Sequence, residues 1–248
     1  MTSTFSERYV KSSSARLWTV SSGTGEAVLC FNGGPGCDDY LEPVAQLIHN
    51  DYQVVRFEPR GCGRSDWDGR YDLDTVLEDA EAIRMAYGLE RWVLLGHSHG
   101  PNVALAYAMR YPERTIGIVG IAGGKVCDSR SWSALYRERL ERVGELSAKA
   151  HWHADPEVNP QGNANWQRYC ERPTLLRDLA ELQIPCVFIN ASEDIRPNWP
   201  THQLAALIPN ARYEEIMGAS HAIWLTHAEE LKAKLREGLD FIEQNNNS

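Results

Sequence analysis

Short apolar runs alternate along the chain with segments in which apolar residues recur every three or four positions. Eight of the short runs predict β-strands, because their length and composition are typical of buried or half-buried strands. The first two runs also alternate apolar with polar residues, as strands at a sheet edge do. The predicted strands are Phe5–Val10, Arg16–Val20, Ala27–Phe31, Tyr52–Phe57, Trp92–Leu95, Thr115–Ile121, Pro185–Asn190 and Ala211–Ile216.

Helices are predicted between many of these strands. In residues 74–87, for example, Val76, Leu77, Ala80 and Ile83 fall on one face of a helix. Strands that alternate with helices are typical of βαβ units and of a parallel sheet. The predicted helices are Asp74–Tyr87, Asn102–Tyr111, Ser131–Lys149, Thr201–Ile208 and Ala228–Ile242.

The pattern changes between the sixth and the seventh predicted strand. Residues 131–149 predict an amphipathic helix, whereas residues 150–173, with three prolines, predict an irregular segment. We therefore expect an α/β fold, with a mostly parallel, eight-stranded sheet flanked by helices and a short helical cap. Residues 1–124 and 183–248 are expected to form the core, and residues 125–182 the inserted cap.

Charge and cysteine usage narrow the classes of partner and compartment. The 248 residues include 25 basic and 34 acidic ones, a formal net charge of −9, and no basic block. Nucleic acids and membranes are therefore not expected partners. No segment has the pattern of a signal peptide or a transmembrane helix. The six cysteines lack Cys-x-x-Cys spacing, which favours reduced thiols and a cytoplasmic location.

A candidate nucleophile lies where the predicted strand Trp92–Leu95 runs into Gly96-His97-Ser98-His99-Gly100. In a Gly-x-Ser-x-Gly turn, a serine sits at a sharp junction between strand and helix, and small residues on either side let the two elements approach closely. Such a turn also aims backbone N–H groups and a helix N-terminus at the serine oxygen. The sequence therefore predicts that Ser98 is a nucleophile.

A nucleophilic serine needs a base, and the base needs an acid that orients it. Asp194 follows the predicted strand Pro185–Asn190, and His221 follows the last predicted strand. Both lie where loops leave the carboxyl edge of a parallel sheet, in the chain order expected for such a triad. Asp194 is preferred as the acid over its neighbour Glu193 and over Asp128, which follows the sixth strand.

Two backbone N–H groups are candidates for binding an oxyanion. One belongs to His99, directly after the nucleophile, and the other to Gly34 in the glycine-rich turn after the third predicted strand. No metal or other cofactor is expected, because His151 and His153 lack a third ligand at suitable spacing. Trp224, three residues after His221, is predicted to wall the substrate pocket.

Several segments resemble the proline iminopeptidase-like branch of the α/β-hydrolase superfamily. Asn32-Gly-Gly-Pro-Gly36 is similar to that branch's His-Gly-Gly-Pro-Gly, with Asn32 in place of histidine. Residues 56–65, Arg-Phe-Glu-Pro-Arg-Gly-Cys-Gly-Arg-Ser, resemble its Asp-Gln-Arg-Gly-Cys-Gly-Arg-Ser segment, and residues 192–197 resemble its acid loop. The resemblance spans about residues 27–227. It implies an α/β-hydrolase fold and a Ser-His-Asp triad, and it implies that Arg60 and Ser65 support the oxyanion loop.

The substrate stays open at this point. Aminopeptidases of that branch have Gly-Gly-Ser-Trp-Gly where this chain has His97 and His99, and they hold the substrate's amine with cap glutamates. The cap contains several glutamates, namely Glu138, Glu141, Glu145, Glu157 and Glu171. We expect a serine hydrolase for a small ester or a short peptide, either an esterase or an aminopeptidase. Hydrolysis of a carbon–carbon bond, or a hydrolase-shaped sensor with slow turnover, are the alternatives. No oligomeric state is indicated.

Overall fold

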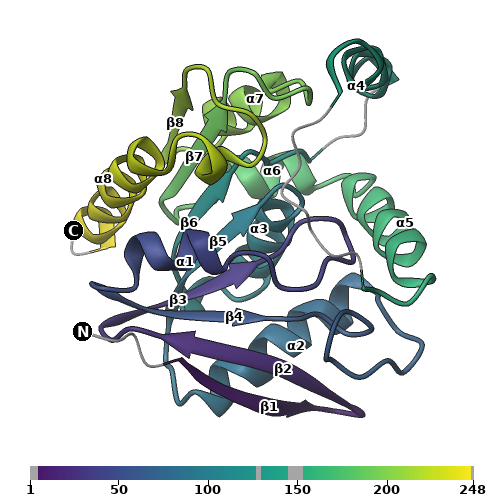
Figure 1. Ribbon diagram of the computed structural model, residues 1–248, viewed down its shortest axis with the longest axis vertical. Helices are drawn as coiled ribbons and strands as arrows, with labels where there is room; N and C mark the ends of the chain where they lie inside the picture. Colours follow the sequence, from purple (N-terminus) through teal and green to yellow (C-terminus); the bar gives the residue numbers. More distant parts are fainter. Residues whose placement is uncertain (1–4, 127–129, 145–152, 247–248) are drawn as a thin grey trace.

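The computed structural model describes residues 5–126, 130–144 and 153–246. Eight strands form one sheet in the order β1-β2-β4-β3-β5-β6-β7-β8 (Figure 1). The β1–β2 and β2–β4 pairs are antiparallel, and the other pairs are parallel. The predicted mostly parallel, eight-stranded sheet is therefore confirmed. The strands are β1 (Ser6–Ser12), β2 (Ala15–Ser22), β3 (Glu26–Phe31), β4 (Tyr52–Phe57), β5 (Trp92–His97), β6 (Thr115–Ile121), β7 (Cys186–Ala191) and β8 (Ala211–Ile216).

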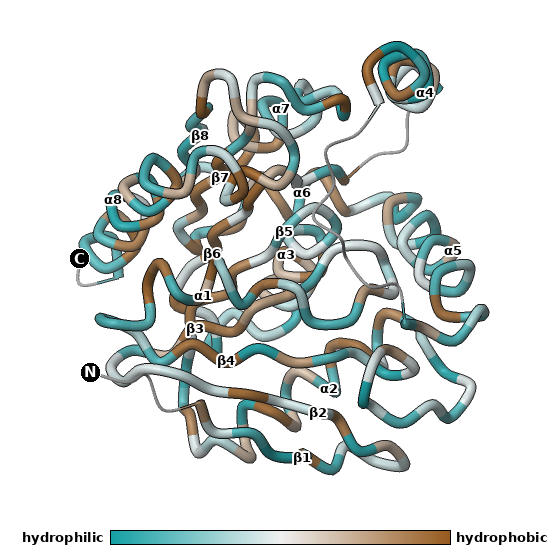
Figure 2. Tube along the Cα trace, viewed as in Figure 1, coloured by the Kyte–Doolittle hydropathy of each residue, from teal (hydrophilic) through white to brown (hydrophobic). Residues whose placement is uncertain are grey.

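Helices cover both faces of the sheet. One apolar layer includes buried residues of α2 (Leu73–Ala86), α3 (Gly100–Arg110) and α7 (Trp199–Leu207), and the other includes buried residues of α1 (Glu42–Ile48) and α8 (Ala228–Asn246). Figure 2 shows apolar residues concentrated along the central strands. Strands buried on both faces need continuous apolar runs, which is why β5 and β6 lack the alternation seen at the edge. Two short 3₁₀ turns, η1 (Pro112–Arg114) and η2 (Ile223–Leu225), complete these elements.

Between β6 and β7 the chain forms α4 (Arg130–Val143), α5 (Val158–Cys170) and α6 (Leu175–Ala180). The prediction that residues 150–173 are irregular is wrong for α5. Pro160 is the third residue of this helix, and a proline in the first turn removes no intrahelical hydrogen bond. The predicted helix Ser131–Lys149 is described as far as Val143, and residues 145–149 lie outside the described part.

The helices of this insertion differ in how they meet the core. Leu175 and Leu179 of α6 belong to the apolar layer beneath α2 and α3. Val158 and Trp166 of α5 join the same layer. In contrast, α4 buries none of its residues and stands away from the sheet (Figure 1). The first part of the insertion is therefore more loosely attached to the core than its last helix.

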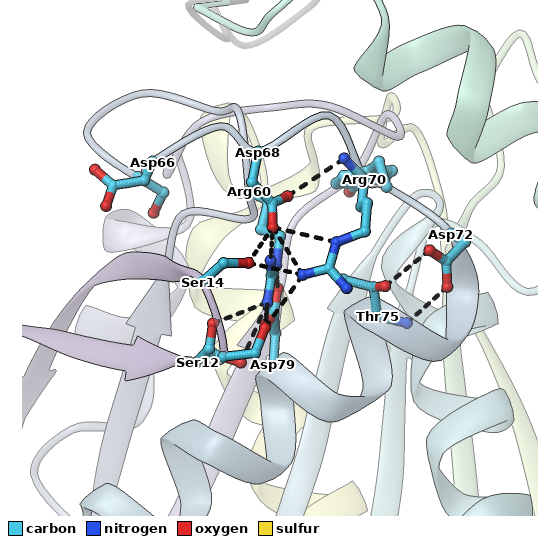
Figure 3. A network of polar contacts seen from close by, with 12 residues as sticks. Ser12, Ser14, Arg60, Asp66, Asp68, Arg70, Asp72, Thr75 and Asp79 are labelled. Carbon is cyan, nitrogen blue, oxygen red and sulfur yellow. Dashed lines mark hydrogen bonds and ion pairs between the residues drawn. The ribbon is translucent and has the colours of Figure 1, made fainter.

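A buried guanidinium fastens the N-terminal hairpin to α2 (Figure 3). Arg60 donates from Nε and Nη2 to the two carboxylate oxygens of Asp79, at 2.7 Å each, and from Nη1 to Asp68 at 2.6 Å. Its Nη2 also donates to the Ser12 carbonyl. Burial raises the pKa of Asp68, but hydrogen bonds from Ser14 and Arg70 and the charge of Arg60 outweigh it and bring the pKa to about 2. The network joins β1, the loop after β4, and α2.

The hydrogen bonds of Arg60 and Ser65 differ from those expected if these residues supported the glycine-rich turn. The Ser65 hydroxyl donates to the Glu58 carbonyl and accepts from the Trp18 N–H. Neither side chain contacts the glycine-rich turn after β3 through any described hydrogen bond. Asn159 does so instead, because its Nδ2 donates to the Pro35 carbonyl at 2.7 Å. Through their hydrogen bonds, Arg60 and Ser65 thus connect the loop after β4 to the hairpin and to α2.

Candidate active site

Ser98 lies between β5 and α3 with φ at +60°. A side chain in this left-handed region is strained, and such strain persists only where the surroundings hold it in place. The Ser98 N–H donates to the Ile121 carbonyl at 2.9 Å. A Cβ atom on Gly96 would lie 2.3 Å from the Gly100 carbonyl carbon, so only glycine allows strand and helix to approach this closely. The local geometry is that of a nucleophile elbow.

Asp194 and His221 meet at the carboxyl edge of the sheet, beyond β7 and β8. His221 Nδ1 donates to Asp194 Oδ2 at 2.6 Å, and both side chains are buried. Burial raises the pKa of Asp194. The hydrogen bond from His221 and the charges of His221 and Arg196 together lower it by more, so the pKa lies below its usual value. Asp194 is therefore a carboxylate at neutral pH, and it fixes the tautomer that leaves His221 Nε2 as an acceptor.

The other two candidates for the acid do not take this position. Glu193 is exposed to solvent, next to the buried Asp194. Asp128 lies outside the described residues. Among the described residues, Asp194 is the carboxylate that contacts His221.

A cavity of about 520 Å³ opens above the carboxyl ends of β5, β6 and β7. We call it the Ser98 cavity. It brings together side chains that lie far apart in the sequence, and Ser98, Asp194 and His221 all line it. Its other lining residues are Gly34, Cys37, Tyr40, His97, His99, Asn102, Ala122, Gly123, Gly124, Lys125, Trp132, Tyr136, Asn163, Trp166, Asn190, Ala191, Arg196, Pro197, Asn198, Pro200, Thr201 and Ala222.

Gly34 and His99, the two candidate oxyanion donors, both line the Ser98 cavity. In the described part of the chain, neither of these backbone N–H groups donates a hydrogen bond. Asn32, which stands where the resembled branch has histidine, donates from Nδ2 to the Phe57 carbonyl at 2.9 Å. The glycine-rich turn is thus fixed to β4 by a side chain, while the Gly34 N–H stays without a described acceptor.

A second polar chain, which the sequence did not predict, joins the glycine-rich turn to the loop of His221. The Tyr40 hydroxyl accepts from the Gly33 N–H at 2.7 Å and donates to His97 Nδ1 at 2.6 Å. His97 Nε2 then donates to the His221 carbonyl at 3.1 Å. Burial is the largest of the effects that hold the pKa of His97 well below its usual value, so the ring is neutral and keeps this donor and acceptor pattern.

Trp224 does not line the Ser98 cavity, so the expectation that it walls the substrate pocket is not met. Its indole lies behind His97, with ring centres 4.8 Å apart, and stacks on Tyr40 at 6.2 Å. The side chain points inward from η2 and is almost fully buried in the core. Trp132 and Trp166, from α4 and α5, line the cavity instead. Trp152 lies outside the described residues.

Replacing Tyr40 by phenylalanine should lower kcat about tenfold or more with little change in KM. The substitution leaves the buried Gly33 N–H and His97 Nδ1 without their hydrogen-bond partner. An unpaired buried polar group costs roughly 1–3 kcal/mol, so both groups should be held less firmly in place. Steady-state kinetics on a 4-nitrophenyl ester measures it. Tyr87→Phe, which removes a hydroxyl hydrogen-bonded to Thr19 far from the cavity, is the matched control. Equal kcat values for the two variants would rule out this positioning role.

Cys37 also lines the cavity, but it is a poor competitor for Ser98 as a nucleophile. Burial raises the pKa of its thiol to about 12, so the thiol is protonated at neutral pH. The described cysteines, Cys30, Cys37, Cys62, Cys170 and Cys186, form no disulfide bond with one another. No group of three or more potential metal ligands occurs within the described ranges. No helix in those ranges is long and apolar enough to cross a membrane.

Comparison with known proteins agrees with this architecture. Residues 26–148 match the family described as the alpha/beta hydrolase fold. A crystal structure of E-2-(acetamidomethylene)succinate hydrolase superimposes with a TM-score of 0.78 over 96% of this chain and 100% of that one, at 16% identity. The chain therefore has the α/β-hydrolase fold.

Part of the chain also resembles proline iminopeptidases. The proline iminopeptidase of Saccharolobus solfataricus is 37% identical over 114 residues, which cover 44% of this chain but only 36% of that relative. The chain thus matches little more than a third of the length of that relative. The putative carbamate hydrolase RutD of Caulobacter segnis is 24% identical over 234 residues, 82% of this chain and 87% of the relative.

Proposed function

We propose that the protein is a serine hydrolase that cleaves small esters through Ser98, His221 and Asp194. The observation that carries the proposal is the 2.6 Å hydrogen bond from His221 to Asp194 in the cavity that the strained Ser98 also lines. A buried histidine oriented by a carboxylate beside an elbow serine is the arrangement that nucleophilic acyl transfer requires. Residues 125–182 are proposed as the cap over this site. The buried, unoxidised Cys30, Cys37, Cys62 and Cys186 are consistent with a cytoplasmic location.

In the proposed reaction, His221 Nε2 removes the proton of the Ser98 hydroxyl as the oxygen attacks the ester carbonyl. The Gly34 and His99 N–H groups hydrogen-bond the oxyanion of the tetrahedral intermediate. Protonated His221 then gives its proton to the departing alkoxide, which leaves an acyl group on Ser98. Water, deprotonated by His221, attacks that acyl group. The bond to Ser98 then breaks, protonated His221 returns the proton to the Ser98 oxygen, and the acid is released. Asp194 stabilises the histidine cation at both steps.

The lining of the cavity favours an ester over a peptide with a free N-terminus. An amine-bearing substrate needs carboxylates near the nucleophile, but Asp194 is the one carboxylate among the described lining residues. The described cap glutamates, Glu138, Glu141, Glu157 and Glu171, are exposed and line no part of this cavity. Glu145 lies outside the described residues. The described residues of the cavity therefore lack the negative charge that an aminopeptidase needs to bind the amine of its substrate.

Two measurements test the proposal. A fluorophosphonate probe should label the protein at Ser98, as located by peptide mass spectrometry, and labelling should disappear in Ser98→Ala. The protein should also hydrolyse 4-nitrophenyl butyrate but not prolyl-β-naphthylamide. Faster cleavage of the naphthylamide, with a requirement for its free amine, would reverse the assignment from esterase to aminopeptidase. Absence of labelling would reject the activated serine.

A further inference from the structure

The imidazole of His99 lines the Ser98 cavity, directly after the nucleophile in the chain. The proposed reaction uses the backbone N–H of His99 as an oxyanion donor but gives its side chain no part. A ring nitrogen in the wall of a substrate cavity can bind a polar group of the substrate, and whether it donates or accepts depends on where the ring carries its proton.

Two hydrogen bonds fix the position of that proton. The Lys125 N–H donates to Asn102 Oδ1 at 2.8 Å, so the oxygen of this amide faces the backbone of Lys125. The other end of the amide, Asn102 Nδ2, lies 3.3 Å from His99 Nδ1. An amide nitrogen can only donate, so Nδ1 is the accepting nitrogen of the ring. In the neutral ring, Nε2 therefore carries the hydrogen.

The His99 ring is neutral at physiological pH. Burial lowers its pKa to about 4, and the charge of Lys125 acts in the same direction. Its tautomer is the opposite of that of His221, whose Nδ1 donates to Asp194 and whose Nε2 accepts. The cavity thus holds one histidine that acts as a base and a second that acts as an uncharged donor.

Packing against Trp166 holds the His99 ring in place. The two rings meet edge to face, with their centres 5.6 Å apart and their planes at 86°. Trp166 Nε1 in turn donates to the Lys125 carbonyl at 3.3 Å. A ring that is packed on one side and hydrogen-bonded through Nδ1 has little freedom to turn. A ligand that accepts from Nε2 therefore has little ordering cost to offset.

The Nε2–H group of His99 has no acceptor within the described part of the chain. It is not one of the polar atoms that are fully enclosed without a partner, so it is accessible. The ring borders two spaces, the Ser98 cavity of about 520 Å³ and a mostly apolar pocket of about 20 Å³. The smaller space has room for little more than one water molecule. A substrate therefore approaches this donor from the Ser98 cavity.

In the proposed reaction, the three groups around the reacting carbon face different parts of the site. The oxyanion faces the backbone N–H donors, and the leaving group faces His221, which protonates it. The His221 ring contacts His97, whereas no ring contact joins it to His99 among the described residues. The acyl chain is the remaining group, and it lies on the side of His99.

We infer that His99 determines specificity by donating a hydrogen bond from Nε2 to an uncharged carbonyl oxygen in the acyl chain of the substrate. The inference rests on the proposed hydrolase function and specifies its substrate class as esters of oxo acids. A neutral ring selects for the presence of an acceptor and adds no positive charge that would favour a carboxylate. An acyl chain without an acceptor leaves Nε2–H unpaired, which disfavours its binding.

A purely structural role is the competing explanation, since the His99 ring also packs against Trp166. The two explanations differ in what they predict for the acyl chain. If the ring only filled space, its replacement would change the rates for alkyl and oxo esters by the same factor. If Nε2 binds an oxygen, its replacement must lower the rate for the oxo ester by more.

The experiment compares kcat/KM for 4-nitrophenyl 4-oxohexanoate and 5-oxohexanoate with that for 4-nitrophenyl hexanoate. The ratio of oxo ester to hexanoate in the wild type is divided by the same ratio in His99→Met, which cancels differences in the intrinsic reactivity of the esters. For at least one oxo ester, this quotient should be about five or more, as expected for a hydrogen bond between neutral groups. A quotient near one for both would overturn the inference.

Two further variants separate the hydrogen bond from the packing of the ring. His99→Gln places an amide N–H near the position of Nε2 and should restore most of the preference for the oxo ester. If it behaves like His99→Met, the effect belongs to the ring itself and the inference is wrong. His202→Met is the matched control, because His202 is exposed on α7 and does not line the cavity. Its quotient should equal that of the wild type.

A measurement without turnover separates failure of the inference from failure of the proposed reaction. In Ser98→Ala protein, long-range ¹H–¹⁵N NMR should show His99 protonated at Nε2, and methyl 5-oxohexanoate or methyl 4-oxohexanoate should shift that nitrogen signal more than methyl hexanoate does. A proton at Nδ1, or equal shifts with all three esters, would reject the donor role whether or not esters are cleaved. The expected shifts in a protein whose wild type cleaves no ester would keep the donor and reject the hydrolase function.

Discussion

Ser98→Ala should reduce kcat on 4-nitrophenyl esters by about 10⁴-fold or more, with only a small change in stability. Removing the nucleophile of a serine hydrolase costs on the order of 10⁶-fold in kcat, and the oxyanion donors retain a small residual rate. The fold should persist, because the strained backbone at position 98 is held by the Ile121 carbonyl and by glycine neighbours, none of which depends on the hydroxyl. Stopped assays on purified protein, with circular dichroism to verify folding, measure the effect.

Cys37→Ala is the informative companion variant, since Cys37 is the second nucleophilic side chain of the cavity. Its thiol is protonated at neutral pH, so this variant should retain most of the activity. The opposite result, with turnover lost in Cys37→Ala and kept in Ser98→Ala, would move the nucleophile from the elbow to the glycine-rich turn.

The largest effect on stability is expected for Asp79→Asn. Arg60 is almost completely buried and donates to both carboxylate oxygens of Asp79. Asparagine would offer one accepting oxygen in place of two and no negative charge to balance the buried guanidinium. Breaking a buried ion pair on one side costs about 3–5 kcal/mol. Urea denaturation should therefore show a free energy of unfolding about 3 kcal/mol lower than in the wild type.

Asp66→Asn provides the matched comparison, because Asp66 pairs with Arg16 where the arginine side chain is 66% exposed. Ion pairs exposed to solvent contribute little, so the urea midpoint of this variant should stay close to that of the wild type. A similar shift for both variants would show that burial does not determine the strength of the Arg60 network.

Much of the core was predictable because its signals are local. A parallel strand buried on both faces must be continuously apolar, and this identified β5 and β6 from composition alone. The elbow around Ser98 can be recognised in the sequence because the backbone there requires glycine at fixed spacing. Asp194 and His221 followed from chain order and from the rule that functional loops leave the carboxyl edge of such a sheet. Their catalytic roles stay predictions until the variants are measured.

The elements that escaped prediction depend on contacts across the fold. Nothing near Tyr40 in the sequence shows that its hydroxyl meets His97, which lies 57 residues further along the chain. Trp224 has the spacing of a pocket residue, yet packing against His97 draws it inward. Helix α5 was hidden by Pro160, because a proline count does not distinguish a first turn from a helix interior.

The position of His97 limits how the elbow can be redesigned. Its ring fills the space between Tyr40, Trp224 and His221, with ring centres 5.5, 4.8 and 4.6 Å away. Grafting the Gly-Gly-Ser-Trp-Gly elbow of the aminopeptidases onto this scaffold would empty that space and free two loops at once. His97, Tyr40 and Trp224 pack against one another as one unit. A change of specificity by engineering would have to exchange the three together.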